Sequence, residues 1–186
     1  MGARIRGRLI AIALSGSLVA CAATTTVDFA GERPAGSLCQ APGESLRALI
    51  AWDTRWRPDQ KEPAKREAMA EQGIRQFAAR SGCYAYVRVE RGPPSMHVAD
   101  VNRVVAITVR ELGPVLKLFS SLALVDGGTE VVLDIATFVP RRSDSRFEFS
   151  EYWRNGGHGV IKGVASLPND LEAALVAALK PAARQR

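Results

Sequence analysis

Short segments in which apolar and polar residues alternate constrain the fold of this chain most strongly. The clearest example, 83–90, alternates Cys83, Ala85, Val87 and Val89 with Tyr84, Tyr86, Arg88 and Glu90. A period of two is typical of a β-strand with one buried face. Weaker forms of the pattern predict strands over 45–52, 103–112, 129–139 and 146–153. The chain therefore needs a partner layer to cover the apolar face of a sheet.

Two other segments place apolar residues at helical spacing and can supply that layer. Between Pro63 and Gly82 the stripe is Ala70, Ile74, Phe77 and Ala78, and after Pro168 it is Leu171, Ala174, Leu175, Ala178 and Leu179. Helices of this kind pack on the apolar face of a sheet. We therefore predict an α+β fold, a two-layer sandwich of a mostly antiparallel sheet and two amphipathic helices.

Three segments are expected to connect these elements. Asp126-Gly127-Gly128 is typical of a turn, and residues 141–145 of a hairpin connection. Residues 156–163 contain four glycines and one lysine, but a phosphate-binding loop would need Gly-Lys-Ser/Thr followed directly by a helix. A flexible connection between the last strand and the last helix is therefore the favoured interpretation.

The amino-terminal residues have the organisation of a secretory signal. Arg4, Arg6 and Arg8 precede the apolar stretch 9–14, and Ser15-Gly16-Ser17 follows it. The thirteen residues 9–21 are too short to cross a bilayer, which takes about 20 residues. We therefore expect residues 1–20 to be a leader that is removed rather than a membrane-spanning anchor.

The end of this leader, Leu18-Val19-Ala20-Cys21, resembles the lipobox of bacterial lipoproteins. In that family the thiol of the cysteine receives a diacylglyceryl group, the peptide is cut before it, and the new amino terminus is usually acylated. The resemblance therefore implies lipidation of Cys21 and attachment to a membrane. Ala22 stands where an Asp in this family signals retention at the inner membrane. This implies the outer membrane, with the protein facing the periplasm.

Composition and charge exclude several classes of protein. The chain has 186 residues, 47% hydrophobic and 24% charged, a balance typical of one folded domain. Its formal net charge of +6 becomes +3 once the three leader arginines are removed, with 22 basic against 19 acidic residues. The remaining basic residues are not clustered with stacking aromatics, as a nucleic-acid interface requires. Nucleic acid is therefore not an expected partner.

The remaining two cysteines, Cys39 and Cys83, form an even pair in an exported protein, which favours a disulfide. Two unpaired thiols are the alternative. The bond would fasten the Gly- and Pro-rich segment 22–44, which we interpret as a tether, to the folded domain. The expected organisation is a signal peptide over 1–20, a lipidated amino terminus and tether over 21–44, one domain over 45–180, and a basic tail over 181–186.

The segment 113–125 is the main candidate for a partner or ligand surface, because Lys117 is its only charged residue. Its large apolar residues are Val115, Leu116, Leu118, Phe119, Leu122 and Leu124. A buried extension of the sheet is the alternative. Trp52 and Trp56 beside Arg55 and Arg57 suggest a second contact surface, since Trp and Arg are enriched at binding hot spots. Core packing is the alternative for both tryptophans.

The sequence contains few residues arranged for chemistry. His97 and His158 are isolated and lie in no metal-binding spacing, so neither a metal nor another cofactor is expected. No nucleophile elbow is present. The acids Asp53, Glu111 and Asp134 could serve a hydrolase only if the fold brought two of them together, and solvated strand acids are the favoured interpretation.

The order of elements, with a late hairpin and a closing Pro-Asn-Asp-Leu-Glu-Ala-Ala-Leu helix, resembles periplasmic lipoproteins of the curli-secretion and transporter-auxiliary kind. It is also similar to the amino-terminal domain of the Tol system's propeller protein. The resemblance implies a non-catalytic assembly or transport accessory with an envelope protein partner, although no pore-forming hairpin pair is visible. A lipid- or apolar-ligand-binding domain walled by 115–125 is the alternative, and an envelope hydrolase is the third hypothesis.

Overall fold

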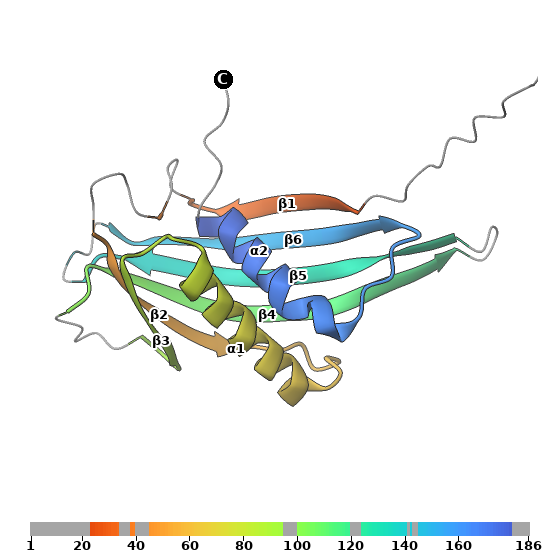
Figure 1. The fold of residues 1–186 in the computed structure, drawn as a ribbon, viewed down its shortest axis with the longest axis horizontal. Helices are drawn as coiled ribbons and strands as arrows, with labels where there is room; N and C mark the ends of the chain where they lie inside the picture. The colour runs from red at the N-terminus through yellow and green to blue at the C-terminus, as the bar shows by residue number, and fades with distance from the viewer. Residues whose placement is uncertain are drawn as a thin grey trace, which may run out of the picture.

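The computed structural model describes residues 23–33, 38–39, 45–94, 100–119, 124–140, 142 and 145–179, with only the backbone of Leu118, Phe119 and Leu124. The elements are β1 (Thr24–Gly31), β2 (Arg47–Thr54), α1 (Pro63–Arg80), β3 (Tyr86–Arg91), β4 (Arg103–Phe119), β5 (Leu124–Phe138), β6 (Phe147–His158), the 3-10 turn η2 (Val164–Ser166) and α2 (Leu167–Leu179). Figure 1 shows both helices on one face of a single sheet. The α+β class predicted from the sequence is confirmed.

The described strands form a six-stranded sheet in the order β1-β6-β5-β4-β2-β3. The pairs β1–β6, β6–β5 and β5–β4 are antiparallel. Strand β2 instead runs parallel to both β3 and β4. The sheet is therefore mixed, and the prediction of a mostly antiparallel sheet is right for three of its five strand pairs. The crossover through α1 makes β3 parallel to β2. The connection from β3 to β4 is a second crossover, because β4 lies on the other side of β2 and runs in the same direction.

The core lies between the helices and the sheet face that Ile50, Val105, Leu133 and Phe149 share. Helices α1 and α2 also pack directly against each other at Gly73. A Cβ atom there would stand 2.8 Å from the carbonyl oxygen of Pro168 and 2.9 Å from the Cβ of Leu171. The absence of a side chain at Gly73 is therefore what brings the two helices close enough to share one core.

Strand β1 corrects the expectation of a linker over 22–44. Residues 24–31 pair with β6 from Thr24 opposite Gly156 to Gly31 opposite Phe149. Val27 and Phe29 pack against the core. The sequence pattern was weak because this edge strand contributes only two large apolar side chains and begins with three threonines. Its stability comes from the pairing with β6, which is more than 100 residues away in the chain.

The glycines of two segments lie inside strands, which corrects the turn predicted at 126–128 and half of the connection predicted at 156–163. In the pairing of β5 with β6, Gly127 is opposite Gly157, and Gly128 is opposite Gly156. A Cβ at Gly128 would lie 2.7 Å from the Cα of Gly156, so the two strands approach more closely than side chains allow. Glycine here permits close strand contact rather than a reversal of the chain.

The sheet has two ends of different construction. The disulfide end contains the carboxyl ends of both helices, Leu38 and the bonded Cys39 and Cys83. The hairpin end is where β4 turns into β5, beside the start of β1 and the end of β6 (Figure 1). Strand β2 stops at Thr54 opposite Val109, so β4 and β5 extend beyond it toward the hairpin end.

Candidate interaction surface

The hairpin end is the main candidate surface, and it is formed by the far halves of β4 and β5. After a register shift between Val109 and Glu111, the pairing runs from Leu112 opposite Val131 to Phe119 opposite Leu124. The strand therefore continues through Pro114. The segment 113–125, over its described part, extends the sheet as one alternative predicted, but it is not buried throughout.

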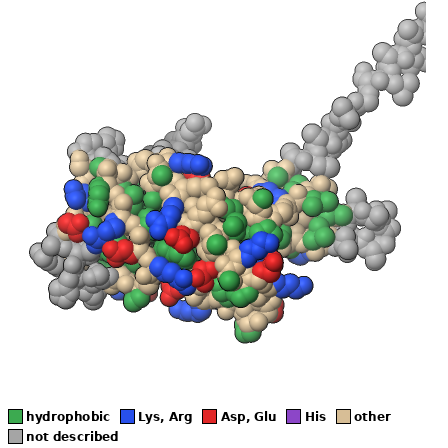
Figure 2. All heavy atoms as spheres, turned by 60° about the horizontal axis from the view of Figure 1, so that its bottom comes forward, with side chains coloured by type: hydrophobic (Ala, Val, Ile, Leu, Met, Phe, Trp, Pro, Cys, Tyr) green, Lys and Arg blue, Asp and Glu red, His purple; other side chains and the backbone are tan. Residues whose placement is uncertain are grey.

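Two large apolar side chains at this end face solvent. Leu116 is 56% exposed and Ile161 is 78% exposed. Val115 and Val160, their neighbours in the chain, are half-buried, and Lys117 is exposed. Figure 2 shows hydrophobic side chains gathered toward this end of the molecule. We call Val115, Leu116, Val160 and Ile161 the apolar end surface.

The glycine pairs bring the two parts of the apolar end surface together. A Cβ at Gly127 would lie 3.3 Å from the Cδ1 of Leu116 and would collide with the carbonyl oxygen of Val160. The loop after β6 therefore lies directly over β5. The amide of Gly159, at φ 73°, donates a hydrogen bond of 2.7 Å to the carbonyl oxygen of Val125. This contact holds the loop that carries Val160 and Ile161.

A buried polar cluster fixes the other end of the same loop. The carboxylate of Asp170, in the first turn of α2, accepts hydrogen bonds from Thr129 (2.6 Å), Ser166 (2.9 Å) and Lys162 (2.6 Å). Lys162 also lies 5.9 Å from the ring of Trp153. The side chain of Lys162 thus points toward the buried Asp170, whereas the side chain of the preceding Ile161 points to solvent.

The other residues that the sequence suggests for a partner or ligand surface differ in their burial. Trp52 is only 2% exposed, so its assignment to a contact surface is wrong and the core-packing alternative holds. The guanidinium of Arg91 lies 5.5 Å from its ring. Trp56 is partly buried against the same core. Leu118, Phe119 and Leu124 have strand backbone, and Leu122 lies outside the described residues.

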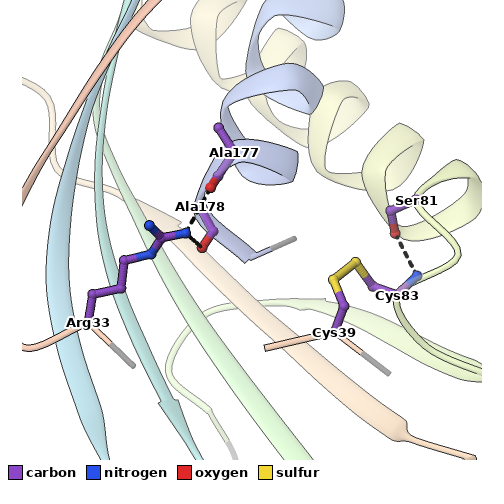
Figure 3. Close-up of a disulfide and its surroundings, with 6 residues drawn as sticks. All are labelled: Arg33, Cys39, Ser81, Cys83, Ala177 and Ala178. Carbon is purple, nitrogen blue, oxygen red and sulfur yellow. Dashed lines mark hydrogen bonds between the residues drawn. A yellow bond between two sulfur atoms is a disulfide. The ribbon is translucent and has the colours of Figure 1, made fainter. Parts of the chain in front are cut away.

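The disulfide predicted between Cys39 and Cys83 is present and closes the opposite end (Figure 3). Beside it, the amide of Leu38 donates to the carbonyl oxygen of Leu179, and Arg33 donates to the carbonyl oxygens of Ala177 (3.0 Å) and Ala178 (2.9 Å). A cation at the carboxyl end of a helix satisfies carbonyls that have no partner within the helix. The segment before β2 therefore caps α2. Cys21 itself lies outside the described residues.

The acids considered for catalysis are not brought together. Asp53 accepts a hydrogen bond from the amide of Thr54, Glu111 pairs with Arg57 at 3.1 Å, and Asp134 accepts from Ser150 at 2.7 Å. Burial raises the pKa of Glu111, and the charge of Arg57 partly offsets this rise. Asp53 and Asp134 line different hollows. The arrangement of these three acids gives the hydrolase hypothesis no support.

The histidines behave as isolated residues where they are described. His158 is exposed at the hairpin end, where it lines a hollow of about 230 Å³ with Asp126 and Arg154. His97 lies outside the described residues. Across the described part of the chain, no three His, Cys, Asp or Glu side chains are grouped as a metal site requires.

The face of the sheet away from the helices is a second candidate surface. It contains a hollow of about 670 Å³ whose floor includes the small residues Ala106, Thr108 and Ala136, with Asp134 and Arg146 among its charged lining. Tyr152 on this face is 47% exposed. We call it the uncovered face.

One buried acid, Glu151, was not predicted from the sequence. Its side chain is fully buried, between Phe29 of β1 and Leu133 of β5. Neither carboxyl oxygen has a hydrogen-bond partner among the described residues. Burial raises the pKa of Glu151 to about 8, although the charge of Arg33 acts in the opposite direction. The signal was available, because Glu151 has the same strand parity as the apolar Phe147 and Phe149.

Comparisons with known proteins identify no family for this chain. No family model matches it, and no curated protein matches it. Among solved structures it is similar to PelC from Paraburkholderia phytofirmans, a dodecamer, at 17% identity and a TM-score of 0.47, covering 84% of this chain and 98% of that one. Protein XCC0632 from Xanthomonas campestris has 18% identity and a TM-score of 0.39, with 79% and 86% covered. At these values the likeness carries no conclusion about function.

A neuraminyllactose-binding hemagglutinin homolog from Helicobacter pylori is also similar, at 10% identity and a TM-score of 0.47, with 82% of this chain and 90% of that one covered. None of the described helices is long and apolar enough to cross a membrane.

Proposed function

We propose that this chain is a bacterial lipoprotein, anchored through Cys21 to the outer membrane and facing the periplasm, that acts as a non-catalytic assembly or transport accessory through protein contacts. The observation that carries the proposal is the disulfide between Cys39 and Cys83. Disulfides persist in oxidising spaces such as the periplasm and are rare in the cytosol. The bond therefore supports export, which the leader before Cys21 predicts independently.

The uncovered face supports the part of the proposal that concerns protein contacts. No described helix covers it, and it presents small side chains beside exposed Tyr152 and several arginines. Tyr and Arg are enriched at protein interfaces, and small residues let a partner approach the backbone. Many of its charges are already paired within the sheet, including Arg110 with Asp134 at 3.4 Å. A face with internally balanced charge favours a protein partner over a charged small ligand.

Lipidation is tested by labelling cells with a fatty acid and recovering the protein from membrane fractions. We expect the label on the wild-type protein, its loss in Cys21→Ser, and its retention in the control Cys39→Ser, whose thiol forms the disulfide. Location is tested by separating inner from outer membranes. Label that persists in Cys21→Ser, or wild-type protein found only in soluble fractions, would contradict the proposed anchor.

Partner contact is tested by photocrosslinking in intact cells. Benzoylphenylalanine replaces Tyr152 on the uncovered face or, as a control, the exposed Gln72 on α1. We expect a defined envelope protein to be crosslinked from position 152 and not from position 72. Repeated recovery of the uncrosslinked protein alone from position 152 would count against the accessory role. An apolar ligand retained by the Cys21→Ser protein in native mass spectrometry would favour the ligand-binding alternative instead.

A further inference from the structure

We propose that the apolar end surface, Val115, Leu116, Val160 and Ile161, docks directly on the bilayer to which Cys21 is attached. The domain would then contact its membrane through a protein surface as well as through lipid. This inference rests on the lipidation proposed above, but it concerns a different contact, because an acylated protein could equally stand away from the bilayer on a long tether.

The first argument for docking is the short length of chain between Cys21 and the sheet. The first described residue is Ala23, and β1 begins at Thr24. Ala23 is two positions after Cys21, and two extended residues span at most about 7 Å. A free tether of 23 residues would instead hold a domain on the order of 25 Å from its anchor. Because residues 24–31 belong to the sheet, the acylated residue has to lie next to the start of β1.

The register of the sheet shows which surface lies beside that anchor. Thr24 pairs with Gly156, Gly156 with Gly128, and Gly128 with Val115, so these residues form one row across four strands. Four further pairs of β4 and β5 continue beyond the row, ending with Phe119 opposite Leu124. At about 3.3 Å per residue they extend about 13 Å past the row. The start of β1, three positions after Cys21, therefore lies at the same end of the domain as the far ends of β4 and β5 (Figure 1).

The chemistry of this end suits an interface between water and acyl chains. Leu116 and Ile161 are 56% and 78% exposed, and Lys117 beside them is exposed as well. Aliphatic side chains enter the acyl boundary while a lysine remains among the anionic head groups. The acid opposite Lys117, Asp126, is already paired with Arg154 at 3.0 Å, which limits its repulsion of those head groups.

The apolar end surface is also held in place before any contact is made. The loop carrying Ile161 is fixed on one side by the hydrogen bond from Gly159 to Val125 and on the other by Lys162 bonded to Asp170. Little conformational freedom is therefore lost when it docks.

The test uses the mature lipoprotein reconstituted into vesicles of phosphatidylethanolamine and phosphatidylglycerol. Benzoylphenylalanine replaces Leu116, Ile161 or Tyr86 in three separate proteins, and lipid adducts are measured by mass spectrometry after illumination. Tyr86 is the matched control, because it is 43% exposed but lies at the disulfide end, opposite Arg47 at the start of β2. We expect several-fold more lipid adducts from positions 116 and 161 than from position 86.

A second measurement separates the docking from the anchor. Leu116→Asp combined with Ile161→Asp should leave the protein acylated and bound to vesicles but should abolish the protection of residues 159–162 from hydrogen exchange that vesicles give the wild type. Tyr152→Asp should keep that protection. If the amino-terminal peptide is acylated but adducts are equal at all three positions, docking is overturned and the proposed function stands. If Cys21 carries no lipid, both are overturned.

Discussion

At the disulfide end, segments that are distant in the chain are bonded to one another. At the hairpin end, large apolar side chains are exposed to solvent. Cys39 is bonded to Cys83, and Leu38 and Arg33 both donate to the last carbonyls of α2. At the other end, Leu116 and Ile161 are more than half exposed although β5 and the loop after β6 hold them in fixed positions. The two ends belong to the same sheet.

This difference separates residues that stabilise the fold from residues that are available for contacts. Changes at the disulfide end and in the buried core should lower or raise the free energy of unfolding. Changes on the apolar end surface should not, because exposed side chains contribute little to it. Four predictions test this division.

The largest effect is expected from removing the disulfide. Cys39→Ser combined with Cys83→Ser opens a loop defined by a sequence separation of 44 residues. Chain entropy predicts a loss of about 4 kcal/mol in the free energy of unfolding. Urea unfolding of the non-lipidated protein measures it. Cys21→Ser without other changes is the reference, and an unchanged midpoint in the double variant would show that this end does not depend on its bond.

The next effect concerns Glu151 and depends on pH. Its pKa is about 8 in the folded protein and near 4.5 when exposed, so the folded protein binds a proton that the unfolded chain releases. Stability is therefore lost as pH rises from about 4.5 to 8, by up to about 1.4 kcal/mol per pH unit. Glu151→Gln cannot ionise, so its advantage over the wild type should grow to about 3 kcal/mol near pH 7.

Urea unfolding between pH 5 and 8 measures this difference. Glu148→Gln is the control, because Glu148 lies on the same strand with its side chain 60% exposed. Parallel pH profiles for the wild type and Glu151→Gln would show that the buried carboxyl has a partner or is already hydrated in the folded protein.

A smaller effect is expected where β5 and β6 approach each other. A Cβ at Gly156 would lie 2.6 Å from the backbone Cα of Gly128, so Gly156→Ala must push the strands apart. We expect a loss of roughly 1–3 kcal/mol, as for overpacked cores. Gly163→Ala is the matched control, since its Cβ would meet nothing within 4 Å. Equal unfolding midpoints for the two variants would remove the structural reason for the glycine pairs.

The smallest effect is expected at the apolar end surface itself. Leu116→Asp combined with Ile161→Asp should change the free energy of unfolding of the non-lipidated protein by less than about 1 kcal/mol. Leu112→Asp, fully buried on the same strand, should prevent stable folding. A large loss from the exposed pair would show that these side chains belong to the folded core in solution.

Particular residues show how far the sequence predicts this structure. The apolar stripes of 63–82 and 167–179 correctly predict both helices, and the alternation of 103–112 correctly predicts a buried strand face. The alternation of 83–90 predicts a strand that begins only at Tyr86, and its Val87 and Val89 are half-buried. The pair of cysteines that remains once Cys21 is assigned to lipidation, Cys39 and Cys83, correctly favours the disulfide. Prediction from the local sequence fails at β1, at the glycines of β5 and β6, and at Trp52. In each case the outcome depends on a neighbouring strand that the local sequence does not identify.

The sequence by itself determined the apolar and polar faces of the elements, because periodicity is local and survives in any packing. It also predicts export and lipidation, since a leader acts before the chain folds. Only the tertiary structure decided that Thr24 lies beside Gly156, that two glycine pairs meet across β5 and β6, and that Glu151 is buried without a partner. These depend on contacts between residues distant in the chain, which periodicity alone does not encode.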